Sequence, residues 1–280
     1  MRRFPTLLAI LLLGGCASPT IPDGATIFPT SNAALSLPPA MQRARMVKRI
    51  RTMVRRSAPS ALTPALERAL AVIGQLPRED FVQPKGRALA YVDAPQDIGF
   101  DQTISDPYIV ALMTAALDLP TDGSANVLDI GTGSGYQAAV LSPLAKRVVS
   151  IEIVKPLADQ ARERLAAMGL RNVTVIAGDG FAGSPDRAPF DGIIVAAGAL
   201  EIPGPLIDQL KVGGRIAMPI GPGAFQEQLI VGTKQPDGTL KRCTLGVTGF
   251  VPLTGRGARP RDYHGLTERG IPLCYGAPVT

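Results

Sequence analysis

Three acidic residues, Asp129, Glu152 and Asp179, each follow a run of apolar residues, at the place where a buried strand would end. Asp129 comes just before a glycine-rich turn, Gly131-Thr-Gly-Ser-Gly135, and the residues after this turn have a helical pattern. A strand, a tight turn and a helix in that order make a nucleotide-type ligand site, because glycine lets a ligand approach the backbone and the helix start offers free N–H groups. On its own, the turn would equally suit a purely structural connection between a strand and a helix.

The glycine spacing and the acid before it favour a ligand without phosphate. A dinucleotide site would need its third glycine where this chain has Tyr136, so NAD is disfavoured. Asp129 would repel a pyrophosphate but can accept hydrogen bonds from an ammonium or hydroxyl group, and S-adenosylmethionine carries both groups. Glu152 is placed to accept from the ribose hydroxyls, and Asp179 could accept from the adenine amino group. The predicted S-adenosylmethionine-binding residues are Asp129, Gly131, Thr132, Gly133, Gly135, Glu152, Asp179 and Gly180.

The composition excludes several other functions. The chain has 280 residues, 46% of them hydrophobic, which supports one large domain with a substantial core. The formal charge is +6, but the excess gathers in residues 43–56 and after Gly255, and there is no tryptophan for base stacking, so we expect no nucleic-acid partner. The single histidine, His264, disfavours Ser-His-Asp or Cys-His catalysis and a His-rich metal site, so we also expect no metal.

Residues 1–16 resemble a bacterial lipoprotein signal peptide. Two arginines precede a short apolar run, Leu7–Leu13, and small residues then lead to Cys16. The run is too short for a permanent membrane span. We therefore expect cleavage before Cys16, a lipid on its sulfur, and anchoring of the protein in the cell envelope. The alternative is an unprocessed N-terminus on a cytoplasmic protein. Residues 17–40, rich in Pro, Ser, Thr and Ala, predict a flexible tether.

Two segments after the tether are predicted to be helical. In residues 41–56, apolar residues recur at helical spacing among seven arginines and lysines. We favour a solvated helix that packs on the domain over one that contacts anionic lipid beside an anchor. Residues 63–76 suit a second helix, with Thr63 as its cap and Pro64 at its first position.

A third helix begins at Pro107, after a stretch to Phe100 that shows no regular pattern. Asp106 is best placed as the N-cap of this helix. Ser105 is then free to serve a ligand at a helix start, where unpaired N–H groups and the dipole favour an anion. The alternative is that Ser105 is itself the cap.

Strand and helix patterns alternate from residue 127 onward, which predicts an α/β fold. Its doubly wound, mostly parallel sheet would carry the ligand crevice at the carboxyl ends of the strands, where the three acids share one rim. After the strand that leads to Asp129, the predicted elements are strands at Val148–Ile151, Val173–Ala177, Phe190–Ala197 and Gly214–Pro219, helices at Pro156–Met168 and near Pro205–Leu210, and a closing antiparallel hairpin of Gln228–Thr233 and Lys241–Val247.

From about Leu62 to Leu253 the sequence resembles the protein-L-isoaspartate O-methyltransferases. The motifs that carry the resemblance are LPREDFV at 76–82, YVDAP at 91–95, IGFDQTISDPY at 98–108, VLDIGTGSGYQ at 127–137, GDG at 178–180, APFD at 188–191, EIP at 201–203 and FVPL at 250–253. The QTIS segment is the most specific of these, because other methyltransferases share the glycine loop but not this segment.

The resemblance implies a Rossmann-like class I methyltransferase that repairs damaged proteins. Such enzymes methylate the side carboxylate of L-isoaspartyl residues, and the ester then collapses to a succinimide that reopens partly to aspartate. The resemblance places the cofactor loop at residues 129–135, the ribose acid at Glu152 and the adenine-side acid at Asp179. It also makes Ser105 the catalytic, substrate-facing residue, with Gln102, Thr103 and Ile104 as further substrate-binding residues. We expect a monomer whose partners are proteins or peptides that contain L-isoaspartate.

This chemistry needs no general base. The isoaspartyl carboxylate is ionised at neutral pH and the sulfonium is an activated leaving group. Alignment of oxygen, methyl and sulfur can supply about 7–11 kcal/mol of the barrier. We expect Ser105 and the N–H groups at the helix start to hold the carboxylate in line.

Some residues depart from the family pattern and keep other functions open. Asp101 stands where the family usually has glycine, and AAGAL at 196–200 lacks the usual threonine and prolines. These departures would suit a methyltransferase with another substrate. A non-catalytic envelope lipoprotein on the same fold is a further alternative, since S-adenosylmethionine is made in the cytosol. An NAD-linked reductase is disfavoured by Tyr136.

The methyltransferase domain is predicted to span residues 41–255, followed by a basic tail, 256–280, of unknown role. If Cys16 is lipidated, Cys243 and Cys274 are the two remaining cysteines, and an oxidising compartment would permit a disulfide between them. Two ordinary thiols are the equal alternative.

Overall fold

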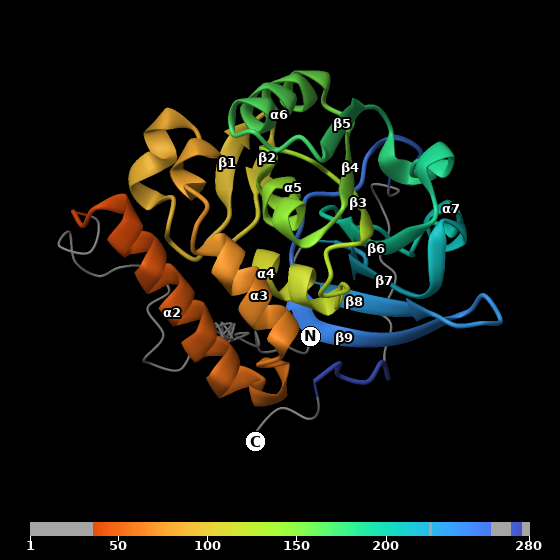
Figure 1. Ribbon diagram of the computed structural model, residues 1–280. Helices are drawn as coiled ribbons and strands as arrows, with labels where there is room; N and C mark the ends of the chain where they lie inside the picture. The colour runs from red at the N-terminus through yellow and green to blue at the C-terminus, as the bar shows by residue number, and fades with distance from the viewer. Residues whose placement is uncertain (1–35, 224–225, 259–269, 276–280) are drawn as a thin grey trace, which may run out of the picture.

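Seven strands form the central sheet in a computed structural model that describes residues 36–223, 226–258 and 270–275 (Figure 1). Their order is β5-β4-β3-β6-β7-β8-β9; neighbours from β5 to β7 run parallel, and β8 and β9 are antiparallel. The predicted doubly wound sheet with a closing hairpin is confirmed. The strands are β3 (Asn126–Ile130), β4 (Arg147–Glu152), β5 (Val173–Ala177), β6 (Phe190–Val195), β7 (Leu210–Ile220), β8 (Glu227–Lys234) and β9 (Leu240–Thr248).

The strands are apolar along most of their length because both faces of the sheet are buried. Side chains alternate between the faces, so Val127 and Val148 join a core with the helices α2–α6, whereas Leu128 and Val149 join a second core with α7. The helices are α2 (Pro39–Ser57), α3 (Pro64–Ile73), α4 (Pro107–Ala116), α5 (Tyr136–Leu141), α6 (Lys155–Ala167) and α7 (Gly204–Asp208).

Helix α2 packs on the domain, as the favoured prediction requires. Met46, Ile50 and Val54 are fully buried on one face, and the guanidinium of Arg43 donates to the carbonyl of Gly74 (2.9 Å). Contact of the exposed basic face with lipid, the alternative to this prediction, is not tested by the packing. In the described segments, no helix is both long enough and apolar enough to cross a bilayer. The expected signal peptide, Cys16 and most of the tail lie outside the described residues.

Both predicted N-caps are present. The hydroxyl of Thr63 accepts from the N–H of Leu66 (3.2 Å), and Asp106 Oδ1 accepts from the N–H of Ile109 (2.8 Å). Helix α3 ends at Ile73, a little earlier than predicted. Because Asp106 caps α4, the side chain of Ser105 is left for another role.

The stretch before α4 is more regular than its sequence suggests. Strands β1 (Gln96–Gly99) and β2 (Gln102–Ile104) form an antiparallel hairpin, so the prediction of an irregular segment was wrong. Phe100 and Asp101 both have a φ of 56°. Two positive φ angles are what a two-residue type I′ turn needs, and neither residue gives the usual Asn-Gly signal for it. The left-handed backbone also explains why glycine suits position 101.

Cys243 on β9 and Cys274 form a disulfide, which decides between the two alternatives for these cysteines. The segment around Cys274 lies along β9: the N–H of Cys274 donates to the carbonyl of Thr244 (2.9 Å), and the N–H of Thr244 donates to that of Pro272 (2.9 Å). Part of the tail is therefore fixed to the domain.

Candidate functional site

A cavity lies at the carboxyl ends of the parallel strands, where the fold predicts the ligand crevice. Its lining combines the β2–α4 connection with the glycine loop. Predicted substrate residues in the lining are Gln102, Thr103, Ile104 and Ser105, and predicted cofactor residues there are Gly131, Thr132, Gly133, Glu152 and Gly180. The structure thus brings two segments together that are about 25 residues apart in the sequence.

Glu152 is held by backbone on both oxygens. Oε2 accepts from the N–H of Gly133 (2.7 Å) and Oε1 from the N–H of Val154 (2.9 Å). A carboxylate has roughly four acceptor sites, so each oxygen keeps capacity for one more donor. This arrangement fits the predicted pair of ribose hydroxyls, and it couples the glycine loop to the same side chain.

Asp129 lies behind the loop and does not line the cavity. It is fully buried, and its Oδ2 accepts from the hydroxyl of Ser150 (2.7 Å). Because the hydroxyl of Ser150 donates its only proton to Asp129, the Thr132 hydroxyl must be the donor in the bond between Thr132 and Ser150 (2.6 Å). Burial raises the pKa of Asp129 to about 7. These three hydrogen-bonded side chains fix Thr132 of the glycine loop to β3 and β4. The predicted direct contact of Asp129 with the ligand stays a prediction.

One carboxylate oxygen of Asp129 lacks a hydrogen-bond donor among the described residues. Its Oδ1 is buried and has no hydrogen-bond partner in the described part of the chain. A buried acceptor without a donor is costly. A ligand ammonium or a proton of its own would satisfy it.

Asp179 is outside the lining, although its neighbour Gly180 is part of it. Its Oδ1 accepts from the N–H of Phe181 (2.9 Å), and its Oδ2 accepts from the backbone N–H (3.0 Å) and Nε (3.3 Å) of Arg256. The start of the tail therefore uses this carboxylate. Its predicted contact with adenine stays a prediction. At Gly180 a Cβ would lie 2.4 Å from Ile130 Cγ2, so the close approach there requires glycine.

Ser105 is half-buried at the cavity wall, and its hydroxyl has no partner among the described residues. The predicted help from the start of α4 was wrong. Asp106 accepts a hydrogen bond from the N–H of Ile109, and Asp93 Oδ1 accepts one from the N–H of Tyr108 (3.0 Å). Pro107, the first residue of the helix, has no N–H. Carboxylate caps have thus already satisfied the donors that a substrate would use.

These two caps are themselves buried acids. Burial raises the pKa of Asp106 to about 6 and also raises that of Asp93. The positive charge of Arg78 partly offsets this rise in pKa for both acids.

Arg78 is a functional residue that the sequence did not reveal. It is completely buried, its Nε donates to the carbonyl of Ala90 (2.9 Å), and its Nη2 donates to the carbonyl of Ser105 (2.7 Å). The guanidinium also lies 4.8 Å from the centre of the Tyr136 ring. Burial lowers the pKa of Arg78. The side chain fixes the backbone of Ser105 and leaves the Ser105 hydroxyl free.

No pattern around Arg78 predicts this burial, because arginine is normally a surface residue. Its position in LPREDFV marks it only as part of a motif. As for metals, the described residues hold no group of three or more His, Cys, Asp or Glu side chains that could bind one.

Comparisons with known proteins agree with this geometry. Residues 61–258 match the family "Protein-L-isoaspartate(D-aspartate) O-methyltransferase (PCMT)". The chain is 45% identical over 214 residues to protein-L-isoaspartate O-methyltransferase 2 of Syntrophobacter fumaroxidans (76% of this chain, 86% of the relative). It is 47% identical over 213 residues to the protein of that name from Polaromonas sp. (75% of this chain, 100% of the relative).

Solved structures show the same fold. One protein-L-isoaspartate O-methyltransferase superposes with a TM-score of 0.65 at 26% identity, covering 77% of this chain and 67% of its own. A putative enzyme of this type from Plasmodium falciparum, solved with S-adenosyl-L-homocysteine, has a TM-score of 0.63 at 21% identity, covering 76% of this chain and 98% of its own.

Proposed function

The chain belongs to the protein-L-isoaspartate (D-aspartate) O-methyltransferase family, and we propose that it carries out this family's repair reaction from an anchor in the cell envelope. It is an S-adenosylmethionine-dependent enzyme that methylates the carboxylate of L-isoaspartyl residues in damaged proteins. The observation that carries this function is the single cavity wall on which the QTIS segment meets the glycine loop and Glu152.

The residues present fit the cofactor. Glu152 would hold the ribose through its two remaining acceptor sites, and the loop Gly131–Gly133 would lie along the rest of the ligand. When bound, S-adenosylmethionine supplies a methyl group on a positively charged sulfur. The buried Oδ1 of Asp129 offers an acceptor that nothing in the described chain uses.

Ser105 would orient the substrate. An isoaspartyl carboxylate is ionised at pH 7, so it needs a donor that positions it and no base that activates it. The Ser105 hydroxyl is that donor, on a backbone that Arg78 fixes through the Ser105 carbonyl. Holding the nucleophilic oxygen in line can supply about 7–11 kcal/mol of the barrier.

The test uses two peptides that differ in a single linkage. The purified protein should transfer labelled methyl groups to an L-isoaspartyl peptide and not to its aspartyl twin. Equal labelling of both peptides would contradict the assignment. Ser105→Ala should raise KM for the isoaspartyl peptide and leave the affinity for S-adenosylhomocysteine unchanged.

Anchoring through a lipid on Cys16 is the second part of the proposal. It is supported by the order of charge, apolar run, small residues and cysteine in residues 1–16 and by the disulfide between Cys243 and Cys274, a bond typical of oxidising compartments. Mass spectrometry of the native N-terminus should find a diacylated or triacylated Cys16. An intact Met1 on protein in the cytoplasmic fraction would contradict anchoring without affecting the enzymatic assignment.

A further inference from the structure

A second cleft, distinct from the cofactor cavity, crosses the opposite edge of the parallel sheet. It measures about 610 Å³, within the range of about 300–1,000 Å³ typical of ligand pockets. Its walls come from the amino ends of β3, β4, β5, β6 and β7, which are neighbours in the sheet. We call it the basic cleft and define it by Asn126, Lys146, Arg147, Arg171 and Lys211.

The basic cleft carries charge of one sign. Four of its lining residues are cations, namely Lys146, Arg147, Arg171 and Lys211, and none is Asp or Glu. Lys211 is neutralised by an ion pair with Asp191 (2.7 Å). Lys146 and Arg171 are exposed, and neither has a side-chain partner in the described residues. A cleft lined by a single charge concentrates the field and attracts counter-ions.

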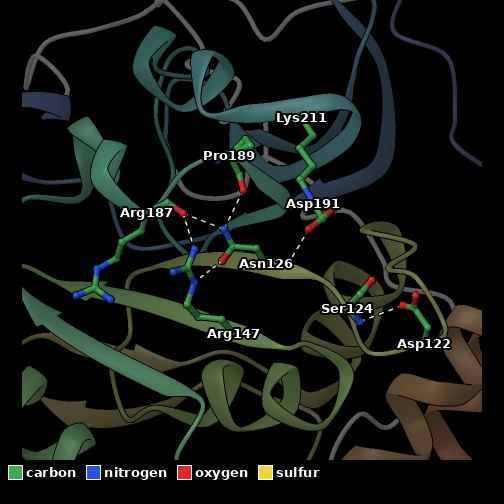
Figure 2. A network of polar contacts seen from close by, with 8 residues as sticks. All are labelled: Asp122, Ser124, Asn126, Arg147, Arg187, Pro189, Asp191 and Lys211. Atoms are coloured by element: carbon green, nitrogen blue, oxygen red, sulfur yellow. Dashed lines mark hydrogen bonds and ion pairs between the residues drawn. The ribbon is translucent and has the colours of Figure 1, made fainter.

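Arg147 is held in place before any ligand arrives. Figure 2 shows its guanidinium beside Asn126 and the carbonyl of Arg187. Nε donates to Asn126 Oδ1 (2.9 Å), and Nη2 donates to the Arg187 carbonyl (2.8 Å). Both partners are neutral, so the charge is not cancelled. Three of the five guanidinium N–H groups have no partner among the described residues and are available to a ligand.

Asn126 completes this frame. Its amide nitrogen donates to the carbonyls of Arg187 (2.9 Å) and Pro189 (2.8 Å), and its backbone N–H donates to Asp191 Oδ2 (2.7 Å) (Figure 2). The nearby carboxylate of Asp191 accepts from the backbone N–H of Asn126 and from Lys211. Because Lys211 offsets its negative charge, the positive charge of Lys146, Arg147 and Arg171 is left in the cleft.

We propose that the basic cleft binds the phosphate groups of a polyanionic ligand. Its donors lie on the ends of several strands and not on a single guanidinium, so they reach a ligand from several directions. A phosphate suits this arrangement, because it presents several oxygens that accept from different directions. The cleft cannot be part of the methyl-transfer site, because β3 and β4 have five and six residues and separate the two edges by about 16–20 Å. The phosphate can belong to a soluble compound or to a lipid headgroup.

The test compares two double variants of the full chain that each lose two exposed positive charges. Both carry Cys16→Ser, so that no lipid anchor masks weak binding. One adds Lys146→Gln and Arg171→Gln in the basic cleft; the control adds Arg55→Gln and Arg56→Gln on α2. Calorimetry with inorganic pyrophosphate at 150 mM salt should show saturable binding to Cys16→Ser alone. Binding should be at least about tenfold weaker in the cleft variant and within twofold of the parent in the control.

Vesicles distinguish the two sources of phosphate. Phosphatidylcholine vesicles with and without phosphatidylglycerol are added to the same three proteins. Binding to the anionic vesicles that pyrophosphate displaces, and that the cleft variant loses, assigns the site to a lipid headgroup. Pyrophosphate binding without vesicle binding assigns it to a soluble ligand.

Two results would overturn the proposal. They are the absence of saturable pyrophosphate binding at 150 mM salt, and an equal loss of binding in the cleft and α2 variants, which would indicate only net charge. Methyl transfer to the isoaspartyl peptide should be the same in all three proteins, because the basic cleft lies at the other edge of the sheet. That control also separates this test from the test of the enzymatic function.

Discussion

Arg78→Met is predicted to destabilise the protein and to misplace Ser105 in the molecules that still fold. Methionine keeps an unbranched, flexible side chain but is shorter than arginine and lacks its donors. The substitution leaves the carbonyls of Ala90 and Ser105 without the guanidinium that now donates to them at 2.9 and 2.7 Å. The first of these bonds is buried and the second partly buried, so each orphaned carbonyl costs about 1–3 kcal/mol.

Other terms reduce this loss. Arg78 is a buried cation whose Nη1 has no partner among the described residues, and its removal relieves a desolvation penalty. We therefore expect the lower end of the range, about 2 kcal/mol less free energy of unfolding. Arg78→Lys should lie between wild type and Arg78→Met, because an ammonium restores the charge on one nitrogen but not the two-pronged geometry.

Urea unfolding at 25 °C measures the stability, and initial rates of methyl transfer measure the positioning. Rates are measured in buffer without urea, where both variants are folded, over a range of isoaspartyl peptide concentrations. If Arg78 positions Ser105, KM for the peptide rises and the affinity for S-adenosylhomocysteine does not change. An Arg78→Met protein with wild-type stability and wild-type KM would show that Arg78 neither stabilises the fold nor positions Ser105.

Three further predictions follow from the site and the disulfide. Glu152→Gln should weaken S-adenosylhomocysteine binding about 10- to 100-fold in calorimetry, because the amide nitrogen cannot accept a hydrogen bond as the second carboxylate oxygen does. The control Glu163→Gln, on the exposed face of α6, should leave this affinity unchanged. Equal affinities in both variants would contradict the role of Glu152. Burial raises the pKa of Asp129 to about 7, so between about pH 4 and 7 the folded chain keeps a proton that the unfolded chain has lost. The free energy of unfolding contributed by this group therefore falls as pH rises through that window, and Asp129→Asn should flatten the dependence in urea titrations at pH 5–8; an unchanged slope would speak against it. Reduction of the bond between Cys243 and Cys274, 31 residues apart, should lower stability by about 2–4 kcal/mol, and thermal unfolding that is insensitive to dithiothreitol would disprove this.

The parts of the fold that the sequence predicted correctly are those with strong local signals. The parallel strands show as apolar runs because both of their faces are buried, and β5 was predicted to the residue. The cap at Asp106 followed from the proline after it, and that cap in turn freed Ser105. Local chemistry was sufficient in each of these cases.

The errors concern contacts between segments that are distant in sequence. Asp93 reaches the start of α4 from 15 residues away, so no local pattern could show that the N–H of Tyr108 was already used. The β1–β2 hairpin turns at Phe100 and Asp101, whose residue types do not announce positive φ angles.

The basic cleft was equally invisible to the sequence. Lys146, Arg171 and Lys211 are spread over 66 positions, and each alone is an ordinary surface cation. They share one cleft only because parallel strands align their amino ends at a single edge. The charge excess in the sequence pointed to α2 and the tail instead.

A crystal structure of the protein with S-adenosylhomocysteine and an L-isoaspartyl peptide would show whether Glu152 and Ser105 hold the cofactor and the substrate. We expect the ribose on Glu152, the sulfur beside the loop Gly131–Gly133, and the isoaspartyl carboxylate hydrogen-bonded to the hydroxyl of Ser105 and facing that sulfur. A peptide carboxylate bound away from Ser105, or a nucleoside that does not touch Glu152, would contradict this expectation.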